Sequence, residues 1–212
     1  MGRNIDPQCK QCRREGLKLF LKGDRCNTQK CAMVKRNFAP GVHGPKQGSG
    51  GASLTGYGIQ LRAKQKAKRV YGILEAQFSK CYEKAVSKRG NSEDELFRLL
   101  ECRLDNVIYR LGLGSSRRQA RQLVNHGHFK VNGKKVTIPS FLVKLNDVIS
   151  IKEKSKKSPT LSQLLETRHN KEMVDWLDFD AKEATGKVTG MPSLEKQRPA
   201  FDIKAIIEFY SR

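Results

Sequence analysis

The sequence CRLDNVIYRLG at residues 102–112, continued by SSRRQARQLVNHGHFKVNG at residues 115–133, decides the fold of the middle of this chain. Apolar residues recur there at helical spacing, which predicts one helix over residues 91–111. Ser92 and Glu95 form a capping box at its start. The apolar positions are Leu96, Leu100, Leu104, Val107 and Leu111.

A second helix and a hairpin follow in the same stretch. Ser116 and Gln119 form another capping box, so a helix begins there. The Asn-Gly pair at residues 132–133, between two short apolar runs, is the strongest short hairpin signal. A return strand over residues 148–151 completes a small α+β module, which we place at residues 101–157. The second helix should turn Ala120, Leu123 and Val124 inward and Arg117, Arg118, Arg121 and Gln122 outward.

Four cysteines near the N-terminus follow the spacing C-x2-C-x13-C-x4-C. They are Cys9, Cys12, Cys26 and Cys31. Paired cysteines at this spacing supply the four thiolates of a tetrahedral zinc site, which has no open position for a substrate. The spacing predicts one structural zinc ion in a module with a basic loop, at residues 1–45. An iron–sulfur cluster is the alternative.

Residues 59–89 are predicted to be helical, and their charge is unusual. Five of the eight positions from Arg62 to Arg69 are cations, with no acid among them to form i,i+4 pairs. We therefore expect the anions to come from outside the chain; a solvated charged face is the alternative.

The apolar end of the chain should pack on the helix predicted over residues 59–89. The predicted fold class is α+β: a mostly helical domain from residues 46–100 and 158–212, with the α+β module inserted and the cysteine module in front.

The net charge of +21 points to a polyanionic partner. Residues 1–90 carry +15, residues 91–157 carry +7 and residues 158–212 carry −1. The first three quarters of the chain should therefore face nucleic acid. The N-terminus has no signal-peptide pattern and no run is long enough to span a membrane, so we expect a cytoplasmic chain with no membrane partner.

Residues 102–133 closely resemble the S4 RNA-binding domain. The segments at residues 57–66, 71–72 and 208–212 resemble the S4 family of bacterial small-subunit ribosomal proteins, and the four cysteines match its zinc-carrying members. This resemblance implies a ribosome-bound protein that binds small-subunit rRNA early in assembly, at a multi-helix junction. It also implies a place near the path by which mRNA enters, beside other small-subunit proteins such as S5, and some relatives repress their own mRNA.

Two positions depart from the family pattern. Ala63 stands where an acid is usual, and Asn146 stands where a turn often has Gly; Asn tolerates the left-handed conformation, so the turn should survive.

The residues expected to face RNA are Arg3, Arg13, Arg14, Lys35, Arg36, His43, Lys46, Arg62, Lys64, Lys66, Lys68, Arg69, Arg103, Ser115, Ser116, Arg117, Arg118, Gln119, Arg121, Gln122, Asn125, His126, His128, Asn132 and Lys134.

Two other functions compete with this interpretation. An RNA-modifying enzyme could carry the same module, and Arg103-Leu104-Asp105 is similar to the catalytic tripeptide of pseudouridine synthases. That tripeptide lies inside the module's first predicted helix, however, and the sequence has no nucleophile–base pair, Gly-rich phosphate loop or open metal site. We therefore predict no catalytic residues. A stress-type ribosome-binding factor is the other rival, but such factors are shorter and lack the flanking segments.

Overall fold

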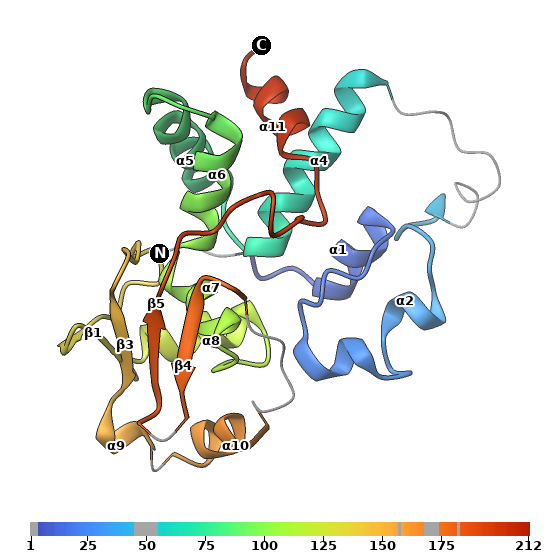
Figure 1. Ribbon diagram of the computed structural model, residues 1–212. Helices are drawn as coiled ribbons and strands as arrows, with labels where there is room; N and C mark the ends of the chain where they lie inside the picture. The colour runs from blue at the N-terminus through green and yellow to red at the C-terminus, as the bar shows by residue number, and fades with distance from the viewer. Residues whose placement is uncertain (1–3, 45–54, 157, 168–173, 182) are drawn as a thin grey trace. The chain divides into compact units, whose positions relative to one another are not determined.

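The computed structural model describes residues 4–44, 55–156, 158–167, 174–181 and 183–212. The chain divides into two compact units, Met1–Leu96 with Arg198–Arg212, and Phe97–Gln197. The elements of the first unit are α1 (Gln8–Glu15), η1 (Gly23–Asn27), α2 (Ala32–Lys35), α4 (Gly56–Tyr71), α5 (Glu75–Ser87), the start of α6 (Ser92–Glu101) and α11 (Ile203–Tyr210) (Figure 1).

The helix predicted over residues 59–89 is two helices, α4 and α5. Gly72 ends α4 in the left-handed conformation, with φ 64°, and its N–H donates to the carbonyls of Arg69 and Lys68. A helix ending of this kind favours glycine, which has no Cβ to strain. Leu74, just before α5, is 38% exposed, whereas Phe78 is fully buried. Leu74 therefore does not belong to the buried face of α5, whereas Phe78 does.

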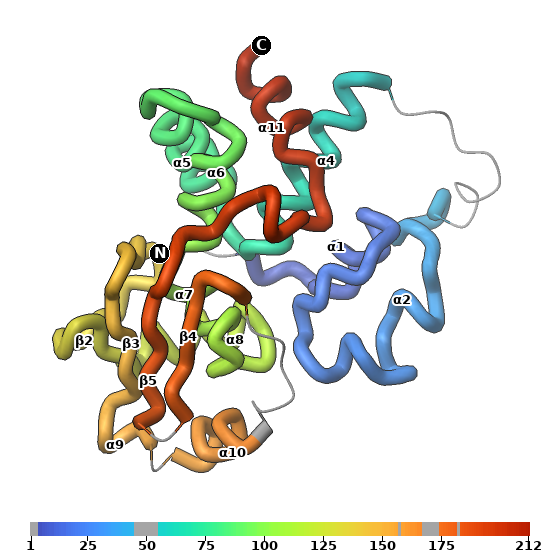
Figure 2. Tube along the Cα trace, viewed as in Figure 1, coloured from blue at the N-terminus to red at the C-terminus, as the bar shows by residue number. Residues whose placement is uncertain are grey.

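The C-terminal helix packs on α4, as expected for the apolar end of the chain. In Figure 2 the last residues, drawn in red, run alongside α4. Phe209 lies against Tyr57, with ring centroids 5.7 Å apart. Tyr210 stacks on Tyr82 at 4.7 Å and on Phe78 at 6.1 Å. These aromatic contacts hold the C-terminal helix against α4 and α5 within the first unit.

The second unit is a five-stranded antiparallel sheet with helices, in the strand order β2-β1-β3-β5-β4. Figure 1 shows α7 and α8 on one side of the sheet, and apolar residues of these helices and of the strands form one buried core. Its elements after α6 are α7 (Leu104–Arg110), α8 (Arg117–Asn125), β1 (Phe129–Val131), β2 (Lys134–Lys135), β3 (Val148–Ile151), α9 (Glu153–Lys156), α10 (Pro159–Thr167), β4 (Leu177–Asp180) and β5 (Thr185–Val188).

The single helix predicted over residues 91–111 is interrupted at Cys102 and Arg103. The carbonyl of Cys102 accepts from the N–H of Val143 instead of continuing the helix, and the N–H of Leu104 donates to the carbonyl of Phe141. The loop before β3 therefore takes the backbone hydrogen bonds that a continuous helix would need. The predicted apolar positions on both helices are nevertheless all buried.

The cap of α6 also differs from the prediction. Asn91, not Ser92, caps the helix, since its Oδ1 accepts from the N–H of Glu93 at 3.0 Å. The turn signals were right: Asn132 and Gly133 have φ 49° and 78° between β1 and β2, and Asn146 has φ 66°.

The expected boundary at residue 158 is wrong, because residues 158–197 belong to the second unit. Strand β5 pairs with β3, placing Gly186 opposite Ile149. A Cβ at Gly186 would lie 2.6 Å from Leu111 Cδ1, so any larger residue would force the Leu111 side chain to shift in the core. Trp176 and Val188 are buried in the same core. Only residues 198–212 join the first unit.

Candidate nucleic-acid interface

The N-terminus of α8 is built by two serines and a glutamine. Ser116 Oγ accepts from the N–H of Gln119 at 3.3 Å, and the N–H of Ser115 donates to Gln119 Oε1 at 2.7 Å. The capping function of Ser116 is confirmed, although Gln119 bonds Ser115 rather than the cap residue itself. Ser116 is buried. These residues shape the start of a helix whose N-terminal end favours anions.

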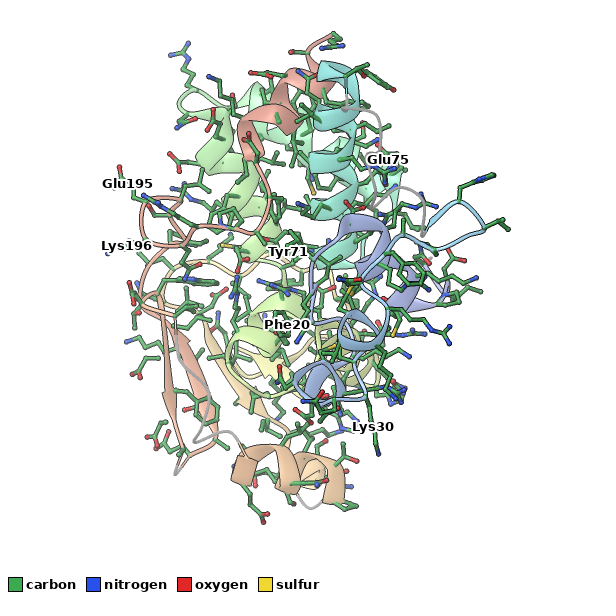
Figure 3. The ribbon with its side chains drawn as sticks, turned by 90° about the vertical axis from the view of Figure 1, so that its right-hand side faces the viewer. Phe20, Lys30, Tyr71, Glu75, Glu195 and Lys196 are labelled. Carbon is green, nitrogen blue, oxygen red and sulfur yellow. The ribbon has the colours of Figure 1, made fainter. Side chains whose placement is uncertain are left out.

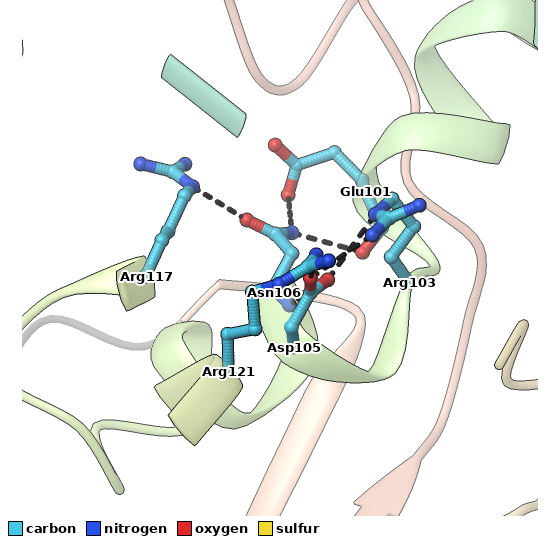
Figure 4. A network of polar contacts seen from close by, with 6 residues as sticks. All are labelled: Glu101, Arg103, Asp105, Asn106, Arg117 and Arg121. Atoms are coloured by element: carbon cyan, nitrogen blue, oxygen red, sulfur yellow. Dashed lines mark hydrogen bonds and ion pairs between the residues drawn. The ribbon is translucent and has the colours of Figure 1, made fainter. Parts of the chain in front are cut away.

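The four arginines of the module that were predicted to face RNA separate into a buried pair, Arg103 and Arg121, and an outer pair, Arg117 and Arg118; Figure 4 shows the buried pair with Arg117. Arg103 and Arg121 are only 3% and 5% exposed. Arg103 donates to both oxygens of Asp105 at 3.2 and 3.0 Å, and Arg121 Nη1 donates to Oδ2 at 3.0 Å. Arg121 was expected to face outward, and this prediction is wrong. A buried carboxylate needs such partners, so both arginines serve the core.

The outer pair lies at the start of α8. Arg118 is exposed, and Arg117 is partly buried with its Nε donating to Asn106 Oδ1 at 2.8 Å. The Arg117 guanidinium also lies over the Tyr109 ring, 4.6 Å from its centroid. Arginine guanidinium groups bind phosphate oxygens with two parallel hydrogen bonds. This end of α8 can therefore bind a phosphate backbone.

The polar residues at the other end of α8 lie at or near the surface. Gln122, Asn125, His126 and Lys134 are exposed, as is Asn132 in the hairpin turn. His128 is partly buried, and its Nδ1 lies 2.9 Å from Ser155 Oγ. Burial, helped by nearby His126 and Lys152, lowers the pKa of His128 and favours its neutral ring. Asn132 Nδ2 donates to Asp147 Oδ1 at 2.8 Å, so this amide also holds the turn.

The hairpin carries a cationic pair that the sequence analysis missed. Lys130 on β1 is directly opposite Lys135 on β2. Like charges directly across an antiparallel pair are destabilising. An anion bound at this edge of the sheet would offset that repulsion. The Asn-Gly turn between the two strands was the signal from which this pairing could have been predicted.

The cations of α4 find acids within the chain, which contradicts the expectation that all their anions come from outside. Lys64 and Lys68 donate to the two oxygens of Glu75 at 2.8 and 2.9 Å, and Figure 3 shows Glu75 beside α4. Arg69 is paired with Glu15, and Arg62 Nη1 lies 3.9 Å from the same oxygen. Lys64 is buried, with its ammonium 4.5 Å from the centroid of the Phe209 ring.

These pairs change which cations of the first unit can face RNA. Lys64 is a buried structural residue, so its ammonium has little surface left for RNA. Lys66 is partly exposed. The acids that pair with α4 come from outside the segment 62–69, so a search for i,i+4 partners within the helix could not find them.

Two arginines of α1 that were predicted to contact RNA instead donate hydrogen bonds to the loop after α2. Arg13 Nε donates to the carbonyl of Phe38 at 2.9 Å, and its guanidinium lies 4.9 Å from the centroid of that ring. Arg14 donates to the carbonyl of Pro40 at 3.3 Å. These two arginines shape the loop. Lys35, Arg36 and His43 are exposed, while Arg3 and Lys46 lie outside the described residues.

The four predicted metal ligands line one pocket in the first unit, between α1, η1 and the start of α2. They are Cys9, Cys12, Cys26 and Cys31. The N–H of Lys22 donates to Cys26 Sγ at 3.4 Å. Burial raises the pKa of Cys12, and its three fellow cysteines raise it further. Across the described ranges, no group of three or more His, Cys, Asp or Glu side chains has an arrangement that could hold a metal ion. The donor set suits zinc, but the thiols do not converge on a coordination centre.

The acids that organise the module were not among the predicted site residues. Glu101 is fully buried and accepts from Arg110 Nε and Nη2 at 2.9 and 2.8 Å, and from Asn106 Nδ2 at 2.8 Å. Buried acids within an apolar helix pattern are a usable sequence signal, since such residues are paired when buried. Asp105, the acid of the tripeptide that is similar to a catalytic motif, is one of these buried acids. Its ion pairs with Arg103 and Arg121 give it a structural role.

Comparisons with known proteins identify the family of this chain. The family described as "Ribosomal protein S4/S9 N-terminal domain" matches residues 3–101, and the family described as "S4 domain" matches residues 102–149. The chain is 53% identical to small ribosomal subunit protein uS4 of Desulforamulus reducens over 212 residues, covering 100% of both chains. It is 52% identical to uS4 of Thermotoga petrophila and 51% identical to uS4 of Clostridioides difficile, again over 100% of each chain. The chain therefore belongs to the small ribosomal subunit protein uS4 family.

Proposed function

We propose that the outer residues of α8 and the β1–β2 hairpin form the principal rRNA contact of the second unit. As a member of the uS4 family, the chain is a structural component of the small ribosomal subunit that binds rRNA, and it is not an enzyme. The observation that carries the location is the cationic start of α8, where Arg118 is exposed and Arg117 is partly exposed in the first turn of the helix. Such contacts recognise the shape and backbone of RNA more than its sequence.

Salt dependence tests this location. We expect Arg118→Gln and Lys134→Gln each to weaken binding to small-subunit rRNA and to reduce the slope of log K against log salt by about 0.7–0.9, the value of one phosphate contact. Filter binding at several salt concentrations measures both. Lys187→Gln is the matched control, because this exposed lysine lies opposite Asp178 on β4. Unchanged slopes in both test variants would reject the location.

We further propose the finer role that the family resemblance implies. The chain would bind early in assembly at an rRNA junction, near the path by which mRNA enters, beside S5, and in the bacterial cytoplasm; it could also repress its own mRNA. The outer face of β4 supports a basic protein partner, since Asp178 and Asp180 are exposed there in a chain of net charge +21. Asp178→Lys should weaken capture of purified S5 but not the binding of rRNA alone. Equal capture of S5 by both proteins would contradict this partner surface.

The four-cysteine pocket supports a further proposal, one structural zinc ion, whose binding would draw the four thiols together from the arrangement seen here. Four thiols line the same pocket, and tetrahedral zinc is the metal that such a set prefers. Part of the Cys12 pKa elevation comes from the other three thiols, and a bound cation would reverse that repulsion. We expect purified protein to contain about one zinc per chain, measured by mass spectrometry, and Cys26→Ser to lose it. A metal-free chain with a protease-resistant N-terminal segment would refute the site.

In the part of the chain that the structure describes, no helix is long and apolar enough to span a membrane.

A further inference from the structure

One face of α7 carries the partners of an outer arginine. Asn106 and Tyr109 are three positions apart on this helix, so they lie on the same side. Asn106 Oδ1 accepts from Arg117 Nε at 2.8 Å, and the Tyr109 ring lies under the guanidinium. The Arg117 guanidinium therefore has one hydrogen bond in its plane, to Asn106, and one ring contact on its face, to Tyr109. In Figure 4 the two terminal nitrogens of Arg117 lie on the side away from Asn106.

Asn106 is itself fixed by a buried acid. Its Nδ2 donates to Glu101 Oε2 at 2.8 Å and to the backbone carbonyl of the same residue at 2.9 Å. Both donor bonds leave the amide only one orientation, with its oxygen toward Arg117. Asn106 is 2% exposed and Glu101 is fully buried, so water does not compete for these bonds. A rigid amide therefore presents one acceptor to a partly exposed arginine.

Holding a long side chain in place before its ligand arrives favours binding. Ordering one such side chain at an interface costs about 0.5–1.5 kcal/mol, which is about two- to tenfold in affinity. Arg118, the next residue on α8, is exposed and makes none of these contacts with α7 among those that the structure records. The two arginines should therefore differ in how they depend on α7.

We propose that Asn106 and Tyr109 are positioning residues that orient Arg117 for an RNA phosphate, with Glu101 fixing Asn106. This inference rests on the RNA contact proposed above for the start of α8. It assigns a measurable share of RNA affinity to a buried amide and to a partly buried ring that packs against the core. That share is carried through Arg117 alone.

A double-mutant cycle on RNA affinity tests the proposal. We expect Asn106→Ala to weaken rRNA binding about two- to tenfold in the otherwise unchanged chain. In the Arg117→Gln background the same substitution should have no further effect, because the side chain that it positions is gone. A purely structural role would give the same loss in both backgrounds, and that result would overturn the proposal. An unchanged affinity of Asn106→Ala would overturn it as well.

Two additions keep the cycle decisive. In the Arg118→Gln background, Asn106→Ala should weaken rRNA binding by the same factor as in the otherwise unchanged chain. Arg118→Gln is therefore the matched control. The fluorescence of Trp176, buried in the same unit, reports whether each variant is folded. If Asn106→Ala does not fold, Tyr109→Leu replaces it in the same cycle, since leucine keeps apolar packing and removes the aromatic ring with its hydroxyl.

The outcomes also distinguish a failure of this proposal from a failure of the proposed RNA contact on which it rests. If Arg117→Gln leaves affinity unchanged while Arg118→Gln and Lys134→Gln weaken binding, the RNA surface stands and the positioning of Arg117 is refuted. If none of the three variants changes affinity or salt slope, the proposed RNA surface is itself wrong.

Discussion

At the scale of single residues, Glu75 neutralises part of the positive charge of α4 by pairing with Lys64 and Lys68. Burial alone would raise the pKa of Glu75, but hydrogen bonds from Lys64, Tyr210 and Lys68 lower it from 4.5 to about 2. The hydroxyl of Tyr210 donates at 2.6 Å. Because the folded pKa is the lower one, the stabilisation is complete above about pH 4.5 and is lost as the pH falls toward 2.

We therefore expect Glu75→Gln to lower the free energy of unfolding at pH 7 by about 1–2 kcal/mol, a value reduced for screening because the side chain is 45% exposed. At pH 3 the difference should be clearly smaller. Urea unfolding followed by circular dichroism measures it. Glu83→Gln, an exposed acid on the same helix, is the control. A penalty of equal size at both pH values would contradict the assignment.

At the scale of elements, Glu15 joins α1 to α4. Its side chain is only 1% exposed, and it pairs with Arg69 and lies near Arg62. Removing one partner of a buried pair is strongly destabilising, but both arginines keep some access to water. We expect Glu15→Gln to cost about 1–3 kcal/mol. The loss should appear locally, as faster hydrogen exchange in α1.

Asp24→Asn is the matched control for this substitution, since Asp24 is an exposed acid in the same N-terminal segment. It should leave the exchange of α1 unchanged. If Glu15→Gln also leaves that exchange unchanged, the ion pair does not hold α1 on α4.

At the scale of the whole molecule, the second unit needs the residues that follow the predicted module. Core residues after position 157 include Leu161, Trp176 and Val188. A fragment of residues 91–197 should fold and give a dispersed NMR spectrum. A fragment of residues 91–157 should not, because it lacks β4, β5 and this part of the core. Equal dispersion in both fragments would contradict the boundary.

Much of the second unit could be predicted from the sequence alone. Ser116 and Gln119 marked the start of α8, the Asn-Gly pair marked the hairpin, and Asn146 took the left-handed conformation expected of it. The apolar positions from Leu96 to Leu111 are all buried. These features depend on residues within about four positions of one another, and such short-range signals are written directly in the sequence.

Only the tertiary structure decided which charges face outward. Arg121 and Arg118 are alike in the sequence, but Arg121 is buried on Asp105, sixteen positions away. Glu15 pairs with Arg69 across fifty-four positions, and β5 reaches β3 from beyond the expected boundary. Such pairings form only when distant segments pack together, and the cost of burying an unpaired charge then selects the partner. The sequence by itself determined α8, the hairpin turn and the RNA-binding class; the packing determined where the long helices are interrupted, that β4 and β5 join the sheet, and which cations remain for RNA.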